Sequence, residues 1–201
     1  SRLADRTCSL CTWRPQADQE KVEHVFTRQA LPMTWDFAEG TFLSERTAGW
    51  NDAYEPPAKL VEAFATLGLH EGSATASSAT AHPLPDDAAQ LFATDPPYYD
   101  AVPYSDLSDF FFVWLKRCLP GGRWPHDPFD PENRLAPKQR ELTVTTVASQ
   151  FGEPKSKDFF EQGISRAFSE GKRTLLEGGI GSVVFAHKTT DGWEALLSGL
   201  I

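Results

Sequence analysis

Two consecutive prolines, Pro96 and Pro97, limit what the middle of this chain can form. They follow a short apolar run at 91–93 that suits a buried β-strand. Proline has no N–H and a fixed φ, so a strand cannot continue through both residues. We therefore expect the strand to end with Asp95 at its carboxyl end and Tyr98 just beyond. In open α/β sheets, ligands bind in the crevice outside this end of the strands.

The chemistry of this turn suits an amine. The carboxylate of Asp95 and the carbonyl of Pro96 form a paired acceptor, and the prolines offer no competing N–H. An amino group can donate two hydrogens to this pair, while Tyr98 or Tyr99 offers a flat face to the ring that bears it. A nucleobase with an exocyclic amine is the expected ligand. The alternative is a tight turn in which Asp95 accepts from nearby backbone N–H groups.

Amphipathic helix patterns follow one another along the chain. The spacing of apolar residues predicts helices at 56–67, 105–118, 157–176 and from 191 onward. Pro57 suits the start of the first helix, and Gly178 with Gly179 suits the end of the third. Asp191 and Glu194 form a capping box for the last helix. The aromatic stripe of the helix at 105–118 predicts a buried face.

Short apolar runs alternate with these helices. Buried strands are predicted at 91–93 and 182–186, with a further strand at 142–147. Strand, helix, strand, helix is the order of a parallel sheet with right-handed crossovers. We therefore predict the α/β class, with a partial Rossmann-like fold, a mostly parallel sheet and flanking helices. Residues 1–55 are expected to be an irregular or extended lead-in, and 56–201 the α/β portion.

Composition and charge indicate which classes of protein this chain can belong to. A hydrophobic content of 40% and a charged fraction of 23% are ordinary for a soluble globular chain, and no apolar run is long enough to cross a bilayer. No signal peptide is evident, so we expect a cytoplasmic protein without a membrane partner. The net charge of −9 argues against a surface that is basic throughout, although the segment 116–140 is net basic. Cys8 and Cys11 lack a second ligand pair, so no metal is expected.

Several motifs together resemble a known family. The ones that carry the resemblance lie at 28–33, 35–39, 95–100, 107–111, 114–115 and 185–188. They are similar to motifs of large prokaryotic adenine-specific DNA methylases that begin with a domain of unknown function. The order of 78–80, 83–86, 91–94 and Asp95-Pro96-Pro97-Tyr98 also resembles two successive motifs of the S-adenosylmethionine-dependent amino-methyltransferases of DNA. The resemblance covers nearly the whole chain, so we expect 1–201 to be part of one methyltransferase catalytic domain.

The resemblance implies a function and a set of site residues. It implies transfer of a methyl group from S-adenosylmethionine to N6 of adenine in DNA, within a restriction or phage-defence system whose other subunits are further expected partners. The catalytic motif would be Asp95, Pro96, Pro97 and Tyr98. Asp95 and the Pro96 carbonyl would accept both amine hydrogens, and Tyr98 would stack on the flipped base.

Three residues are candidates for contacting the cofactor. Ser78 and Ala79 match the motif that contacts the adenine of the cofactor, with serine where many relatives hold an acid. Asp36, between two aromatic residues, is a third candidate for contacting the cofactor, and a hydrogen bond to local backbone is its alternative role.

One motif of such enzymes is absent from the sequence. They hold the methionine part of the cofactor on a glycine-rich strand-to-helix turn, and this chain has none. We expect a piece of a longer protein, incomplete at both ends, whose N-terminal part carries that turn. By itself the chain should bind S-adenosylmethionine weakly or not at all. The alternatives are a methyltransferase of cytosine N4, RNA or a protein amide, and a non-catalytic nucleic-acid-binding fragment.

Overall fold

The structure is a computed structural model that describes 49–119, 130–145 and 153–200. It also describes Asp5, Cys8, Thr41, Leu43 and Asp127, and the backbone at 13–16 and 19–22. The chain divides into two compact units. The first comprises Ser1–Ala74 and Phe110–Arg123, and the second comprises Thr75–Asp109 and Trp124–Ile201. In the part of the chain that is described, no helix has the length and apolar character needed to cross a membrane.

The first unit contains a short hairpin and one long helix. Strand β1 (Trp13–Gln16) pairs antiparallel with β2 (Gln19–Val22), and helix α2 spans Trp50–Ala65. This helix begins before Pro56 and Pro57, which lie inside it, so the prediction that Pro57 marks its start is wrong. The earlier start is favoured because Ala53 is buried and its N–H bonds to the carbonyl of Gly49.

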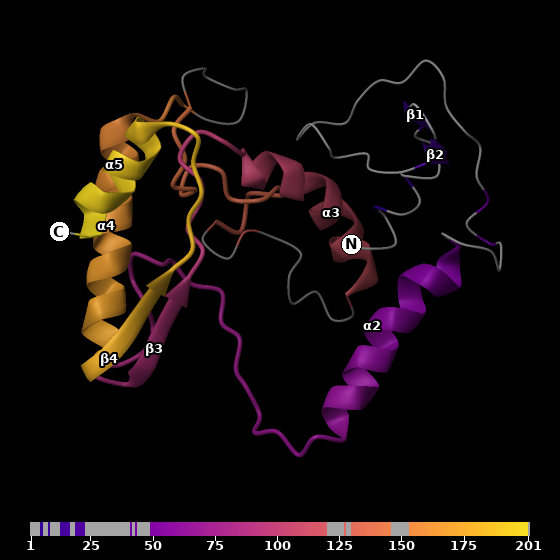
Figure 1. Cartoon of the computed structure of the whole chain (residues 1–201), viewed down its shortest axis with the longest axis horizontal. Coiled ribbons are helices and arrows are strands. Elements are labelled where there is room, and N and C mark those ends of the chain that lie inside the picture. Colours follow the sequence, from indigo (N-terminus) through magenta and orange to yellow (C-terminus); the bar gives the residue numbers. More distant parts are fainter. Residues whose placement is uncertain are drawn as a thin grey trace. The chain divides into compact units, whose positions relative to one another are not determined.

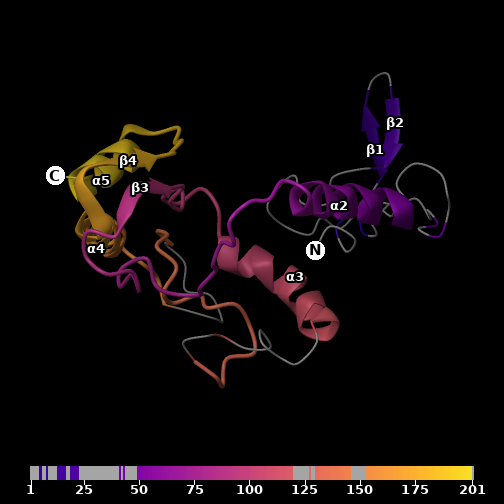
Figure 2. The same ribbon diagram turned by 90° about the horizontal axis from the view of Figure 1, so that it is seen from below.

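The second unit is built on a pair of parallel strands. Strand β3 (Ala89–Thr94) pairs with β4 (Leu175–Val183). Helix α3 (Tyr104–Cys118) follows β3 along the chain, and its residues up to Asp109 belong to this unit, whereas those from Phe110 belong to the first. Helix α4 (Lys157–Thr174) leads into β4, and helix α5 (Thr190–Leu200) follows it. The views in Figures 1 and 2 show α4 and α5 beside the two strands. The prediction of mixed α/β structure with parallel strands is confirmed for this pair.

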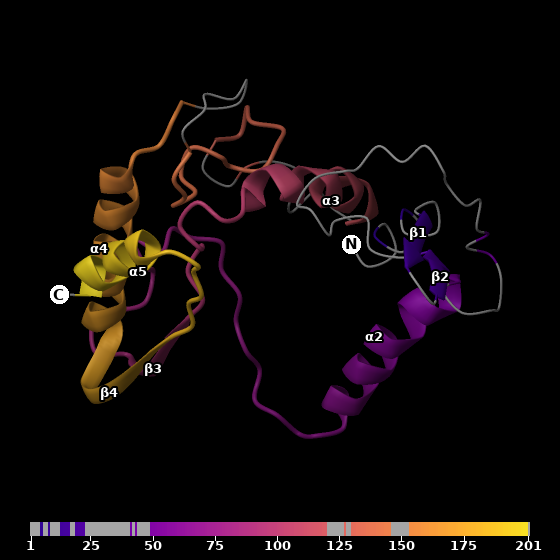
Figure 3. The ribbon, with the colours of Figure 1, turned by 45° about the horizontal axis from the view of Figure 1, so that its top comes forward.

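The core of this unit lies where α4 meets α5. Phe160 and Ile164 of α4 are the largest side chains that are fully buried, and they pack with Ala195 and Leu196 of α5. A Cβ added to Gly199 would lie 2.8 Å from a methyl carbon of Ile164. Only glycine therefore allows the close approach of the two helices, which Figure 3 shows crossing.

The junction between α4 and β4 differs from its prediction. Helix α4 ends at Thr174 and the strand begins at Leu175, so Gly178 and Gly179 lie inside the strand. Gly178 has a φ of +80°, which glycine adopts without strain. It lies in a bulge, because between the pairs Ala89–Leu175 and Leu91–Ile180 strand β3 advances by two residues and β4 by five.

Other element boundaries also depend on tertiary contacts. Helix α5 is capped by the hydroxyl of Thr189, which accepts from the N–H of Gly192, so the predicted capping box of Asp191 and Glu194 is wrong. Asp191 lies inside the first turn, where its charge still suits the helix dipole. The strand predicted at 182–186 is also wrong in its end, because β4 stops at Val183.

Two predictions around α3 also need correction. The strand predicted at 142–147 is wrong for the described residues 142–145, which form only one bridge, between Thr145 and Lys155. The N–H of Val144 donates instead to the carbonyl of Tyr99 in a loop. Residues 146–147 lie outside the described residues. Helix α3 is confirmed at nearly its predicted bounds, but its stripe is not fully buried, since Trp114 is 48% exposed.

Hydrogen bonds and ion pairs of charged side chains connect the loop before β3 to the end of α4. Arg173 donates to the carbonyls of His82 and Leu84, both at 3.0 Å, and pairs with Glu170. Glu170 in turn accepts from the N–H of His82 at 2.8 Å. The hydrogen bond from Arg173, followed by the one from His82, lowers the pKa of Glu170 to about 2. This network sets where β3 begins.

Truncation of the core phenylalanine should be costly. We expect Phe160→Ala to lower the free energy of unfolding by about 3–5 kcal/mol, because it leaves a cavity in a fully buried site. The neighbouring variant Phe159→Ala is the matched control, since Phe159 is 37% exposed and its loss should cost less than half as much. Urea unfolding followed by circular dichroism measures both. Equal losses would contradict the position of the core.

The Glu170 network should make stability depend on acid pH. A carboxylate whose folded pKa is lowered contributes stability above its unfolded pKa and loses that contribution as the pH falls through the folded value. Wild type should therefore be more stable than Glu170→Gln at pH 7, and the difference should shrink between about pH 4.5 and pH 2. Urea unfolding of both proteins at stepped pH measures it. A difference that is constant with pH would disprove this role for the charge.

Candidate functional site

The turn after β3 has an unusual backbone. The carbonyl of Thr94 accepts from the N–H of Val184 at 2.9 Å, which continues the parallel ladder to the last residue of β3. The chain then turns, and the N–H of Tyr99 donates to the carbonyl of Pro97 at 3.0 Å. Tyr99 has a φ of +52°, a left-handed conformation that costs a tyrosine on the order of 1 kcal/mol or more. Surrounding contacts must therefore hold the turn.

These contacts come from three directions. The carbonyl of Tyr99 accepts from the N–H of Val144 at 3.0 Å. The ring of Tyr99 meets the buried ring of Phe160 edge-on, with centroids 5.2 Å apart, and the imidazole of His187 at 5.6 Å. This burial raises the pKa of the Tyr99 phenol. Tyr99 is thus anchored in the core, and the adjacent Tyr98 lies at the wall of a cavity.

All four residues of the predicted catalytic motif line one cavity. Asp95, Pro96, Pro97 and Tyr98 surround a hollow of about 450 Å³. Its remaining lining residues come from three other segments, and they are Ala79, Tyr104, Glu141 and Leu142. The volume is in the range of pockets that hold small ligands, roughly 300–1,000 Å³. The wall is mostly apolar and carries two carboxylates.

The two carboxylates, Glu141 and Asp95, have different hydrogen-bond partners. Glu141 accepts from the backbone N–H of Ser105 at 3.0 Å and from its hydroxyl at 2.5 Å, so both of its oxygens are used at the start of α3. Asp95 is exposed, and its hydrogen bond with the Tyr98 hydroxyl is the main cause that raises the pKa of Tyr98. Burial, then the charges of Asp95 and Glu141, raise the pKa of Tyr104. A carboxylate has about four acceptor positions, so Asp95 can still accept from a ligand.

The predicted cofactor segment lies next to this cavity. Ser78 and Ala79 line a second hollow of about 490 Å³, which shares Ala79, Glu141 and Leu142 with the first. The hydroxyl of Ser78 is 2.8 Å from that of Thr80 and also accepts from the Thr80 N–H. The structure therefore brings the two predicted segments together, with the Ser78 hydroxyl engaged locally.

The described residues fit an amine better than they fit the whole cofactor. Asp36, the third predicted cofactor contact, lies outside the described residues. The strand-to-helix turns that follow β3 and β4, at 95–103 and 184–189, contain no glycine. A side chain at every position prevents the close backbone approach that the methionine part of S-adenosylmethionine needs. Among the described residues, no group of three or more His, Cys, Asp or Glu side chains is placed to hold a metal.

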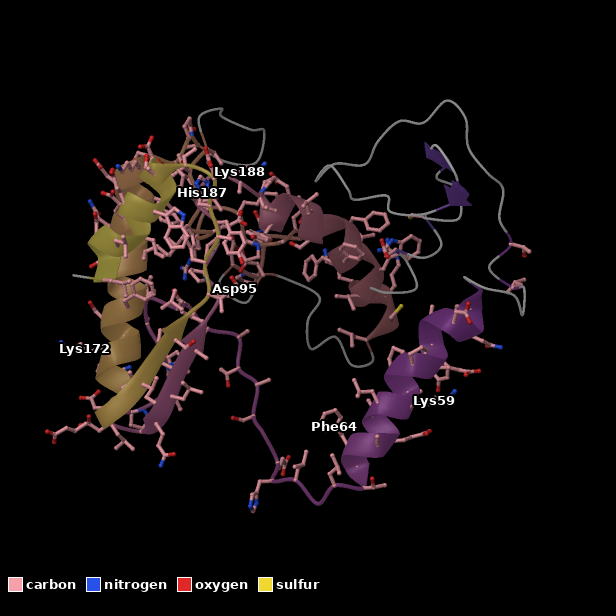
Figure 4. All side chains as sticks on the ribbon, in the orientation of Figure 1. Lys59, Phe64, Asp95, Lys172, His187 and Lys188 are labelled. Atoms are coloured by element: carbon pink, nitrogen blue, oxygen red, sulfur yellow. The ribbon has the colours of Figure 1, made fainter. Side chains whose placement is uncertain are left out.

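Several residues at the site were not predicted. Phe185 and His187 follow β4, and Figure 4 shows His187 beyond the end of that strand and Asp95 at the end of β3. The rings of Phe185 and Tyr98 meet edge-on at 5.5 Å. Their position after an apolar run was a usable signal, because the carboxyl ends of parallel strands meet at one edge of a sheet. Glu141 had no such signal, since its segment lacks a periodic pattern.

Comparisons with known proteins add no relative. No protein-family model matches the chain, and neither a curated sequence nor a solved structure does.

The Asp95–Tyr98 contact can be tested by titration. In Asp95→Asn, the pKa of Tyr98 should fall toward its ordinary value, because the charged acceptor that stabilises its protonated form is gone. Tyr104 should shift in the same direction, since Asp95 also raises its pKa. NMR titration of the ¹³Cζ signals of labelled tyrosines measures both shifts. Asp87→Asn, at the other end of β3, is the control, and identical curves for Asp95→Asn and wild type would refute the contact.

Proposed function

We propose that this chain carries the amine-binding site of an S-adenosylmethionine-dependent methyltransferase that acts on N6 of adenine in DNA. One observation carries the proposal: an exposed carboxylate and a rigid proline pair meet at the mouth of a cavity, with a tyrosine in its wall, at the carboxyl end of a parallel strand. The resemblance of this turn to the amino-methyltransferase motif agrees with that chemistry.

Different groups of the turn would bind the two hydrogens of the amine and the ring that bears it. Asp95 would accept one amine hydrogen, and the carbonyl of Pro96 would accept the other. With both hydrogens held, the nitrogen lone pair has a fixed direction, and positioning of this kind supplies much of the rate in such a transfer. Tyr98 would support the ring of the base, which must leave the DNA stack to enter a cavity. S-adenosylmethionine, when bound, supplies an electrophilic methyl group.

The proposal covers the amine half of the reaction. Ser78 and Ala79 would contact the adenosine part of a cofactor, and the hollow that they line adjoins the amine cavity. The described turns provide no glycine-rich backbone for the methionine part, so no step of the mechanism is assigned to them. We expect weak binding of S-adenosylmethionine by this chain alone. In a prokaryotic cell the proposed DNA substrate lies in the cytoplasm.

The transfer reaction tests the proposal directly. The complete product of the natural gene is incubated with labelled S-adenosylmethionine and unmethylated duplex DNA, and the nucleosides are then separated. We expect label in N6-methyladenine, and a loss of at least about 100-fold in Asp95→Ala, because the amine loses its charged acceptor. Asp95→Asn should be intermediate, since an amide oxygen still accepts. Asp87→Asn, at the opposite end of β3, should retain activity.

Other outcomes identify the alternatives. Label in N4-methylcytosine, in RNA or in a protein amide would assign the same site to another planar substrate with an exocyclic amine. Binding of nucleic acid without any transfer, unchanged in Asp95→Ala, would show a non-catalytic binding protein and would refute the methyltransferase proposal.

A further inference from the structure

His187 bridges the turn after β3 to the start of α5. Its side chain is only 6% exposed, and Nδ1 lies 3.2 Å from the backbone N of Thr189. Because a backbone N–H can only donate, Nδ1 must carry a lone pair, and the proton of the neutral ring lies on Nε2. Nε2 then donates to Oδ1 of Asp100 at 3.0 Å. The contacts on both sides of the ring therefore select one neutral tautomer.

The same ring is packed against Tyr99 and Phe185. It meets Tyr99 edge-on at 5.6 Å and lies nearly parallel to Phe185 at 6.2 Å. Phe185 meets Tyr98 at 5.5 Å, so the chain of ring contacts reaches the amine cavity. A Cβ on Gly192 would lie 2.3 Å from Nδ1 of His187, which shows how closely α5 packs on the ring. Displacement of His187 would move the tyrosines as well.

We propose that His187 is a positioning residue for the amine site, whose neutral imidazole holds the turn at Tyr98 and Tyr99 through Asp100. This inference rests on the proposed function. A proton on Nδ1 would face the N–H of Thr189, donor against donor, and would break that bond.

Two substitutions separate the contacts on either side of the ring. His187→Gln keeps an amide N–H that can reach Asp100. His187→Asn keeps an acceptor for Thr189 but is too short to reach Asp100. In the transfer assay, His187→Asn should lower kcat by about 10- to 100-fold with little change in KM, because the turn is displaced while the cavity remains. His187→Gln should keep most of kcat, because it restores the contact with Asp100.

A second measurement does not depend on methyl transfer. The ¹³Cζ signals of Tyr98 and Tyr99 should both move in His187→Asn and stay close to their wild-type positions in His187→Gln. His70→Asn, a change at an exposed histidine, should behave as wild type. Tyrosine signals that are the same in wild type and His187→Asn, or full kcat in a folded His187→Asn, would overturn the inference.

The outcomes also separate this inference from the proposed function. Absence of any methylated product from wild type refutes the proposed function, and the tyrosine signals still decide whether His187 positions the turn. If circular dichroism shows that His187→Asn is unfolded, the tyrosine signals of Asp100→Ala decide, because this variant removes the same contact from its other side.

Discussion

The parallel pairing of β3 and β4 is the constraint on which the candidate site depends. Because the two strands run in the same direction, the segments that follow them leave from the same edge. The hydrogen bond from Val184 to Thr94 continues the pairing beyond β4 and holds the two exits together. Tyr98 therefore meets Phe185, and Asp100 meets His187, although these residues are far apart in the chain. An antiparallel pairing would have placed them at opposite ends.

Helix α4 connects the stability of the core to the geometry of this edge. At its start, Phe160 packs in the core and also meets the ring of Tyr99. Near its end, Gly171 lies so close to Phe92 of β3 that a Cβ would come within 2.7 Å, and Arg173 fastens the loop before the strand. Helix α4 thus contacts both the loop before β3 and the turn after it, so substitutions in the core should alter the geometry of the amine cavity.

Local patterns predicted the elements better than their boundaries. The bounds of α3 and the start of α4 follow from apolar spacing and a serine cap within the same stretch. Gly178 was assigned to a helix end, because glycine is the usual residue there. In the structure it adopts a φ of +80° in a bulge, and the bulge is required by the partner strand, which no pattern within 157–183 contains. The cap at Thr189 is local, because its hydroxyl accepts from the N–H of Gly192 three residues on, and the capping pattern at Asp191 and Glu194 pointed to the wrong residue.

The sequence by itself determined that a strand ends close to Asp95 and that Pro96 to Tyr98 lie just outside it, because proline geometry acts within a few residues. In the structure the strand ends one residue earlier, at Thr94. It also determined which chemical groups the turn presents, namely a carboxylate beside rigid carbonyls and aromatic rings. Only the tertiary structure decided which distant residues complete the site. Glu141 reaches Ser105 across 36 positions, and His187 reaches Asp100 across 87. Contacts over such separations depend on strand pairing and helix packing, which combine segments that carry no signal for one another.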